Sequence, residues 1–165
     1  MMQTSRDLIT LVAETLQHGH VVTLTVVSGS MRPALRVGDR VRVEPATPAT
    51  VRFGDVVVLD TGDDLLTHRF LGWRQGRMLT KGDALMAADT FPRPPRLIGR
   101  VVGYERNGVY RDWRTPRARW GHWALGQVGY FALQCARLQR PAPLHWLVQK
   151  GWRALGMVCV YVARL

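Results

Sequence analysis

Hydrophobic and polar positions alternate with two different periods along this chain. Between residues 5 and 18 the apolar side chains recur on one helical face, which predicts a short amphipathic helix that ends before Gly19. The next segment, residues 21–27, is mostly β-branched and predicts a strand. The chain is therefore expected to open with a helical segment, residues 1–20, and then to enter a sheet.

Short apolar segments separated by turn signals continue as far as residue 106. Gly-Asp pairs recur between these segments and favour tight turns. The segments with strand-like patterns are 41–43, 56–59, 65–73, 78–81 and 97–104. Many short strands with close turns are typical of a compact antiparallel arrangement. The sequence predicts a mainly β fold, with one antiparallel β-domain over residues 21–110.

The composition changes beyond Asn107-Gly108, a pair that favours a hairpin turn. Residues 120–140 and 144–164 have the length and pattern of helices, and Pro141 and Pro143 separate them. The fold prediction is thus completed by a C-terminal helical pair within a third region, residues 111–165.

The charge of the chain is strongly positive and unevenly distributed. The formal net charge is +11, from 23 Lys and Arg against 12 Asp and Glu. Residues 1–110 are nearly balanced, whereas residues 111–165 carry most of the excess cations and most of the Trp. Such a surplus indicates an anionic partner, either a nucleic acid or a membrane surface.

The basic, Trp-rich region allows two interpretations of its role. Cationic side chains beside Trp are typical of helices that lie on an anionic bilayer, so residues 113–165 can bind a membrane surface. Alternatively, these helices pack on the β-domain and their Trp side chains fill the edge of its core. A DNA-binding regulator is the least favoured hypothesis, because the basic helices are unusually apolar and the segment before the β-domain is too short for a helix-turn-helix. We expect no nucleic-acid partner.

The sequence predicts neither a metal site nor a cofactor. Cys135 and Cys159 are too few for a disulfide framework or a zinc site, and their apolar surroundings favour buried thiols. The amino-terminal segment has charged residues where a secretory signal would be apolar, and no stretch is a convincing membrane span. We therefore expect a cytoplasmic protein, with peripheral attachment to the inner membrane face as an option that residues 113–165 allow.

Ser30 is the first residue that suggests chemistry. It follows a predicted strand, next to Gly29, on a turn that Pro33 ends. Such a turn can present a hydroxyl beside backbone N–H groups, and Gly29 would let a substrate backbone approach. The hydroxyl of Ser28 can act as a second donor to a developing oxyanion. A serine in this position needs a neighbouring base to become a nucleophile.

His68 is the candidate for that base. It is the one histidine that lies inside a strand-like run between apolar residues. A carboxylate usually orients such an imidazole, and Asp83 and Asp89 are both candidates for this role. The sequence pattern leaves the choice between the two open.

Six short motifs in a fixed order make the pattern more specific than any single residue does. They are Ser28-Gly-Ser-Met-Arg-Pro33, Gly38-Asp39, Gly54-Asp-Val-Val57, Thr67-His-Arg69, Thr80-Lys-Gly-Asp83 and Ile98-Gly-Arg-Val101. Over residues 20–106 the chain resembles the serine-peptidase superfamily of type I signal peptidases and self-cleaving repressors.

This resemblance implies a role for each matching residue. Ser30 matches the nucleophile and Ser28 the residue whose hydroxyl helps to bind the oxyanion. His68 stands where bacterial signal peptidases have a lysine base, as in the archaeal and endoplasmic-reticulum enzymes. Asp89 stands where those enzymes keep their third catalytic residue. Lys81 belongs to the Lys-Gly-Asp motif and does not match the base.

The resemblance therefore implies a serine endopeptidase that cleaves a precursor or leader peptide through an acyl-enzyme, with small residues before the scissile bond. Two features depart from the family. Ala84 and Leu85 follow the Lys-Gly-Asp motif in place of the usual asparagine, and an amphipathic helix replaces the membrane anchor before the serine. The alternative is an inactive peptidase-fold module that binds a membrane surface or a protein partner.

Overall fold

The computed structural model of the protein describes residues 2–137, 151 and 154–161. Its elements are α1 (Met2–Gln17), β1 (Val22–Thr25), β2 (Arg40–Pro45), β3 (Val56–Asp60), β4 (Leu65–Arg74), β5 (Arg77–Lys81), β6 (Arg96–Arg106), β7 (Val109–Asp112) and α2 (Pro116–Arg137). Residues 154–161 form a further helical segment. The predicted mainly β fold, with an N-terminal helix and C-terminal helices, is confirmed.

All the strands belong to one seven-stranded antiparallel sheet. Its order is β1-β2-β6-β3-β4-β5, and β7 pairs with the C-terminal part of β6, residues 103–106. The hairpin between β6 and β7 turns at Asn107 and Gly108, which both have positive φ angles, as the sequence predicted. Because β6 pairs with β2, β3 and β7, it joins the first strands of the chain to the strands that carry the candidate site.

Hydrophobic and polar residues do not alternate along the central strand β3, because both of its faces are covered. Val56 and Val58 belong to the main hydrophobic core on one face of the sheet, while Val57 and Leu59 belong to a second cluster on the other face. Successive strand residues point to opposite faces, so a strand that is covered on both faces has a continuous apolar run.

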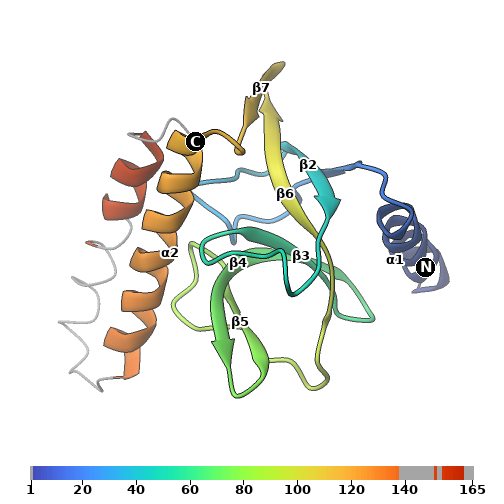
Figure 1. Cartoon of the computed structure of the whole chain (residues 1–165), viewed down its shortest axis with the longest axis horizontal. Coiled ribbons are helices and arrows are strands. Elements are labelled where there is room, and N and C mark those ends of the chain that lie inside the picture. Colours follow the sequence, from blue (N-terminus) through green and yellow to red (C-terminus); the bar gives the residue numbers. More distant parts are fainter. Residues whose placement is uncertain (1, 138–150, 152–153, 162–165) are drawn as a thin grey trace.

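The two long helices lie at opposite ends of the molecule in Figure 1, and both contribute to the same main core. α1 packs against β1, β2 and β6 and buries its apolar face there, including Val12 and Leu16. α2 packs against β4. The main core joins both helices to the sheet, and its largest members include Leu16, Met31, Leu35, Val41, Val43, Val56, Tyr104, Trp113 and Leu125.

The boundaries of the helices differ from the predicted ones. α1 begins at Met2 rather than at residue 5, and α2 begins at Pro116, ahead of the predicted Trp120. The reason for the early start of α2 is its cap. The hydroxyl of Thr115 accepts a hydrogen bond from Ala118 N at 3.3 Å, and Pro116 fits the first helical position.

In the C-terminal region, α2 packs on the β-domain, as one of the two interpretations of the sequence expected. One face of α2 is buried on the sheet, and Trp113 just before it is in the core. Trp120 and Trp123 instead face outward, with exposed fractions of 55% and 49%, so they do not fill the edge of the core. The predicted helix 144–164 lies partly outside the described residues.

The cysteines are less buried than predicted. Cys135 and Cys159 are free thiols of intermediate exposure, and Cys159 packs at the margin of the main core. Each lies on a helix that uses only one face for packing, which leaves residues at the border of that face half-covered. Among the residues that the structure describes, no helix is both long enough and apolar enough to cross a bilayer.

Candidate active site

Ser30 lies on the connection between β1 and β2, on a short turn that the core holds in place. The residues after it, Met31, Ala34 and Leu35, are all buried, and Leu35 N donates a hydrogen bond to Met31 O at 3.0 Å. Ser30 itself is half-buried, and its Oγ is 3.1 Å from the Oγ of Ser28. The two serine hydroxyls that the sequence singled out are therefore neighbours, backed by apolar side chains.

His68 lies on β4 and is 3% exposed. Its Nδ1 is 2.8 Å from Oδ2 of Asp89, and the hydroxyl of Thr80 donates to the same carboxylate oxygen at 2.7 Å. A carboxylate oxygen accepts hydrogen bonds, so Nδ1 of the neutral imidazole carries the proton and Nε2 carries the lone pair. Asp89 thus selects the imidazole tautomer that can take a proton at Nε2.

The Nε2 atom of His68 is buried and has no hydrogen-bond partner among the described residues. It lies against the Cα of Gly82, as does the carbonyl oxygen of Ser30. A Cβ at Gly82 would be 2.8 Å from Ser30 O and 3.0 Å from His68 Nε2. Only glycine fits between these two groups, and its small size lets the serine turn and the histidine strand approach each other.

One loop after β5 connects the three candidate residues. Ala84 N donates to Ser30 O at 2.8 Å, and Asp89 N donates to Thr80 O at 2.9 Å. The loop that supplies the Asp89 carboxylate is therefore hydrogen-bonded to the serine turn through Ala84 and to the end of β5 through Asp89.

Asp83, the other carboxylate that the sequence left open, contacts a different residue. Arg69 donates to its two oxygens at 2.7 and 2.6 Å, a bidentate pair that is almost fully buried. The structure thus places Asp89 beside His68, whereas the Asp83 carboxylate binds the guanidinium of the residue after that histidine.

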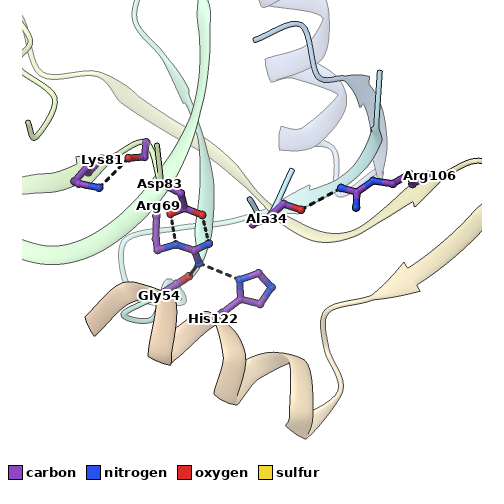
Figure 2. Close-up of polar contacts among 8 residues, drawn as sticks. Ala34, Gly54, Arg69, Lys81, Asp83, Arg106 and His122 are labelled. Carbon is purple, nitrogen blue, oxygen red and sulfur yellow. Dashed lines mark hydrogen bonds and ion pairs between the residues drawn. The ribbon is translucent and has the colours of Figure 1, made fainter. Parts of the chain in front are cut away.

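Arg69 also connects the sheet to α2 (Figure 2). Its Nη1 donates to Gly54 O at 2.6 Å and to Nδ1 of His122 at 3.0 Å. The His122 ring packs on Trp113 with a centroid distance of 4.1 Å. Burial, and secondarily the Arg69 charge, hold the pKa of His122 well below its usual value, so the ring is neutral and accepts at Nδ1.

Lys81 is a second buried cation beside this loop. Its Nζ donates to Gly82 O at 3.0 Å, and the side chain is 3% exposed. Burial lowers the pKa of its ammonium group below the usual value. Lys81 lies opposite Arg69 in the β4–β5 pairing, which places its side chain at the α2 side of the sheet.

Sequence reasoning missed three residues that hold the site together: Thr80, Arg69 and His122. Thr80 and Arg69 stand inside recognised motifs, but no spacing rule links a strand arginine to a loop aspartate. His122 lies far away in the sequence, and its position next to Arg69 depends on how α2 packs. The described residues contain no group of three or more His, Cys, Asp or Glu side chains that could hold a metal ion.

Comparisons of the chain with protein-family models, curated proteins and solved structures find no significant match.

Proposed function

We propose that this protein is a serine endopeptidase in which Ser30 is the nucleophile, His68 the general base and Asp89 the residue that orients it. One observation carries the proposal: a buried imidazole whose Nδ1 is fixed by a carboxylate at 2.8 Å and whose Nε2 has no partner beside the Ser30 turn. The Nε2 atom of His122 is also buried without a partner among the described residues, so His68 is distinguished by the carboxylate at its Nδ1 together with the Ser30 turn beside its Nε2.

The proposed reaction assigns one role to each of these residues. Ser30 Oγ attacks the scissile carbonyl carbon while its proton passes to His68 Nε2, and the carbonyl oxygen becomes an oxyanion. The C–N bond then breaks, and His68 returns the proton to the leaving amine. Water, deprotonated by the same imidazole, attacks the acyl-enzyme and releases the new carboxyl group and the free serine.

Stabilisation of the oxyanion is assigned to Ser28 and to the backbone N–H of Ser30. The Ser28 hydroxyl, 3.1 Å from the nucleophile oxygen, is close enough to donate to an oxygen that develops next to it. Such a donor is worth about 10²–10³-fold in rate. A precursor or leader peptide is the proposed class of substrate.

A fluorophosphonate that labels activated serines tests this proposal. The chain contains only three serines, so intact mass and peptide mapping can assign the site directly. Labelling of the unsubstituted protein should occur at Ser30 and fall at least about 10³-fold in Ser30→Ala and in His68→Ala. Ser5→Ala is the matched control and should label normally. A Ser30→Ala variant that is labelled at the original rate would refute the proposal.

A specific observation also supports a peripheral attachment of this peptidase to a membrane. The outer face of α2 carries four aromatic side chains of which 37–55% is exposed. They are Trp120, Trp123, Tyr130 and Phe131. Exposed arginines at the start of the helix, including Arg119, lie near the two Trp. Trp at an interface and cations for lipid phosphates are what an interfacial helix requires.

Co-sedimentation with vesicles tests this attachment. Binding to phosphatidylglycerol vesicles should exceed binding to phosphatidylcholine vesicles and should weaken about tenfold or more in the Trp120→Ser/Trp123→Ser variant. Trp73→Ser is the matched control, because Trp73 is equally exposed (50%) but lies on β4. Equal binding of all three proteins to the anionic vesicles would argue against the attachment.

A further inference from the structure

A cavity of about 500 Å³ opens beside the catalytic residues, between the sheet and the C-terminal helices. One wall is the turn around Ser30, and another is the loop after β5. The third wall comes from α2 and from the helical segment 154–161. The apolar lining residues that matter here are Pro33, Leu85, Met86, Leu125, Val128 and Met157.

Several residues that line this cavity are direct neighbours of residues of the Ser30–His68 site. Gly29, which lines it, directly precedes the nucleophile. Lys81 and Asp83 also line it, and they flank Gly82, the residue that contacts both Ser30 O and His68 Nε2. A Cβ at Gly82 would be 3.0 Å both from Leu85, which lines the cavity, and from His68 Nε2, so a group bound in the cavity would lie close to the candidate site.

The chemistry of the lining suits an amino-acid residue with a large apolar side chain. Its walls are mostly aliphatic, and its volume lies in the range of small-ligand pockets. The Asp83 carboxylate is already bound by Arg69 and offers little to a ligand. The Lys81 ammonium has three donors, and its one hydrogen bond among the described residues goes to Gly82 O. The remaining donors can bind a peptide carbonyl that accompanies an apolar side chain.

We propose that this cavity is a substrate subsite that binds one large apolar residue near the scissile bond, in addition to the small residues that the family resemblance implies before that bond, with α2 and residues 154–161 as the wall that determines specificity. The inference rests on the proposed peptidase function. It assigns the C-terminal helices a part in substrate selection in addition to any contact with a membrane.

Alkyl fluorophosphonates of increasing chain length test the subsite, because they react with the nucleophile and carry an apolar group of known size. The second-order rate of Ser30 labelling is measured for the methyl, butyl and octyl compounds on the full chain. The butyl or octyl compound should label at least about tenfold faster than the methyl compound, since each buried methylene contributes to the affinity.

Two cavity-filling variants from different walls give the comparison. Val128→Trp on α2 and Met157→Trp on the segment 154–161 should each reduce the ratio of butyl to methyl rates to about twofold or less. Gln134→Trp is the control, because Gln134 is exposed on α2 and does not line the cavity. Its ratio should equal that of the unsubstituted protein, and circular dichroism establishes that each variant is folded.

The possible results separate this inference from the proposed function. Labelling of Ser30 by all three compounds at similar rates would overturn the subsite and leave the peptidase standing. A chain-length preference that persists in both filled variants would also overturn it. Failure of every compound to label Ser30 would overturn the peptidase and the subsite together.

Discussion

Substitution of Asp83 by Asn tests how much the fold depends on the buried ion pair beside the loop that follows β5. In the structure Arg69 is 1% exposed and its guanidinium is bound by both Asp83 oxygens at 2.6–2.7 Å. Asn keeps the size of the side chain but removes the charge, so Arg69 becomes an uncompensated buried cation. Breaking a buried pair in this way costs about 3–5 kcal/mol.

That loss is large compared with the total free energy of unfolding of a typical domain, about 5–15 kcal/mol. Urea unfolding followed by circular dichroism measures it directly as a shift of the midpoint. Asp63→Asn is the matched control, because Asp63 pairs with Arg6 at 3.3 Å on the surface, where both side chains are mostly exposed. Loss of that pair should change the stability by less than about 1 kcal/mol.

The same substitution in an Arg69→Met background gives the decisive comparison. Removal of Arg69 leaves Asp83 as a buried carboxylate without its partner, so Asp83→Asn should then be neutral or stabilising. Asp83→Asn cannot restore the full stability of the Arg69→Met protein, because Gly54 O and His122 Nδ1 have also lost Arg69 as their donor. Each unpaired acceptor costs about 1–3 kcal/mol. An equal destabilisation by Asp83→Asn in both backgrounds would show that the pair contributes no coupling energy and would refute this reasoning.

Three further predictions concern the site itself. Gly82→Ala should slow Ser30 labelling about 100-fold or more, because the added methyl group would push against the backbone of Ser30 and displace the nucleophile. Gly151→Ala is the control, because open space surrounds Gly151, and it should not change the rate. Similar rates for the two variants would contradict the geometry. Asp89→Asn should slow labelling about 10⁴-fold by favouring the wrong imidazole tautomer, and a loss below tenfold would exclude an orienting role. The lowered pKa of His122 means that below pH ~6.5 the unfolded chain binds a proton that the fold excludes. As the pH is lowered below ~6.5, the free energy of unfolding should therefore decrease by up to ~1.4 kcal/mol per pH unit. His122→Asn should remove this pH dependence. An unchanged dependence in that variant would show that another group causes it.

The strands could be predicted from the sequence because the signals that define them are local. Each predicted segment from residue 41 to residue 104 falls within an observed strand, and the turn at Asn107-Gly108 lies where its residue types require it. The order of the strands could not be derived in the same way. It depends on which apolar faces meet, and β6 joins β2 to β3 although neither is its neighbour in the chain.

In the candidate site, too, the residues with a local sequence signal could be predicted, and the contacts that depend on the fold could not. Ser30 and His68 stand out because motifs of fixed order contain them, Asp89 follows the Lys-Gly-Asp motif by six residues, and the structure places Asp89 Oδ2 within 2.8 Å of the imidazole. The binding of Asp83 to Arg69 has no comparable signal. Asp83 ends the Lys-Gly-Asp motif and Asp89 follows it by six residues, and only the path of the loop decides which carboxylate faces the histidine.

The C-terminal helices connect to the site in a way that the basic, Trp-rich composition of residues 111–165 does not suggest. α2 approaches the turn before β3 closely enough that a Cβ at Gly54 would be 2.5 Å from His122 O, and one at Gly126 would be 2.7 Å from Phe53. Through this close contact His122 reaches Arg69, and Arg69 holds Asp83 in the loop that also carries Asp89.

Removal of α2 would therefore do more than remove a surface. It would expose the Arg69 guanidinium, take away the His122 acceptor and open one wall of the cavity beside Ser30. A truncated chain that loses both membrane binding and activity could not tell an anchor from a structural support. Substitutions on the outer face of α2, at Trp120 and Trp123, leave those buried contacts in place, and for this reason they are the variants that can separate attachment from catalysis.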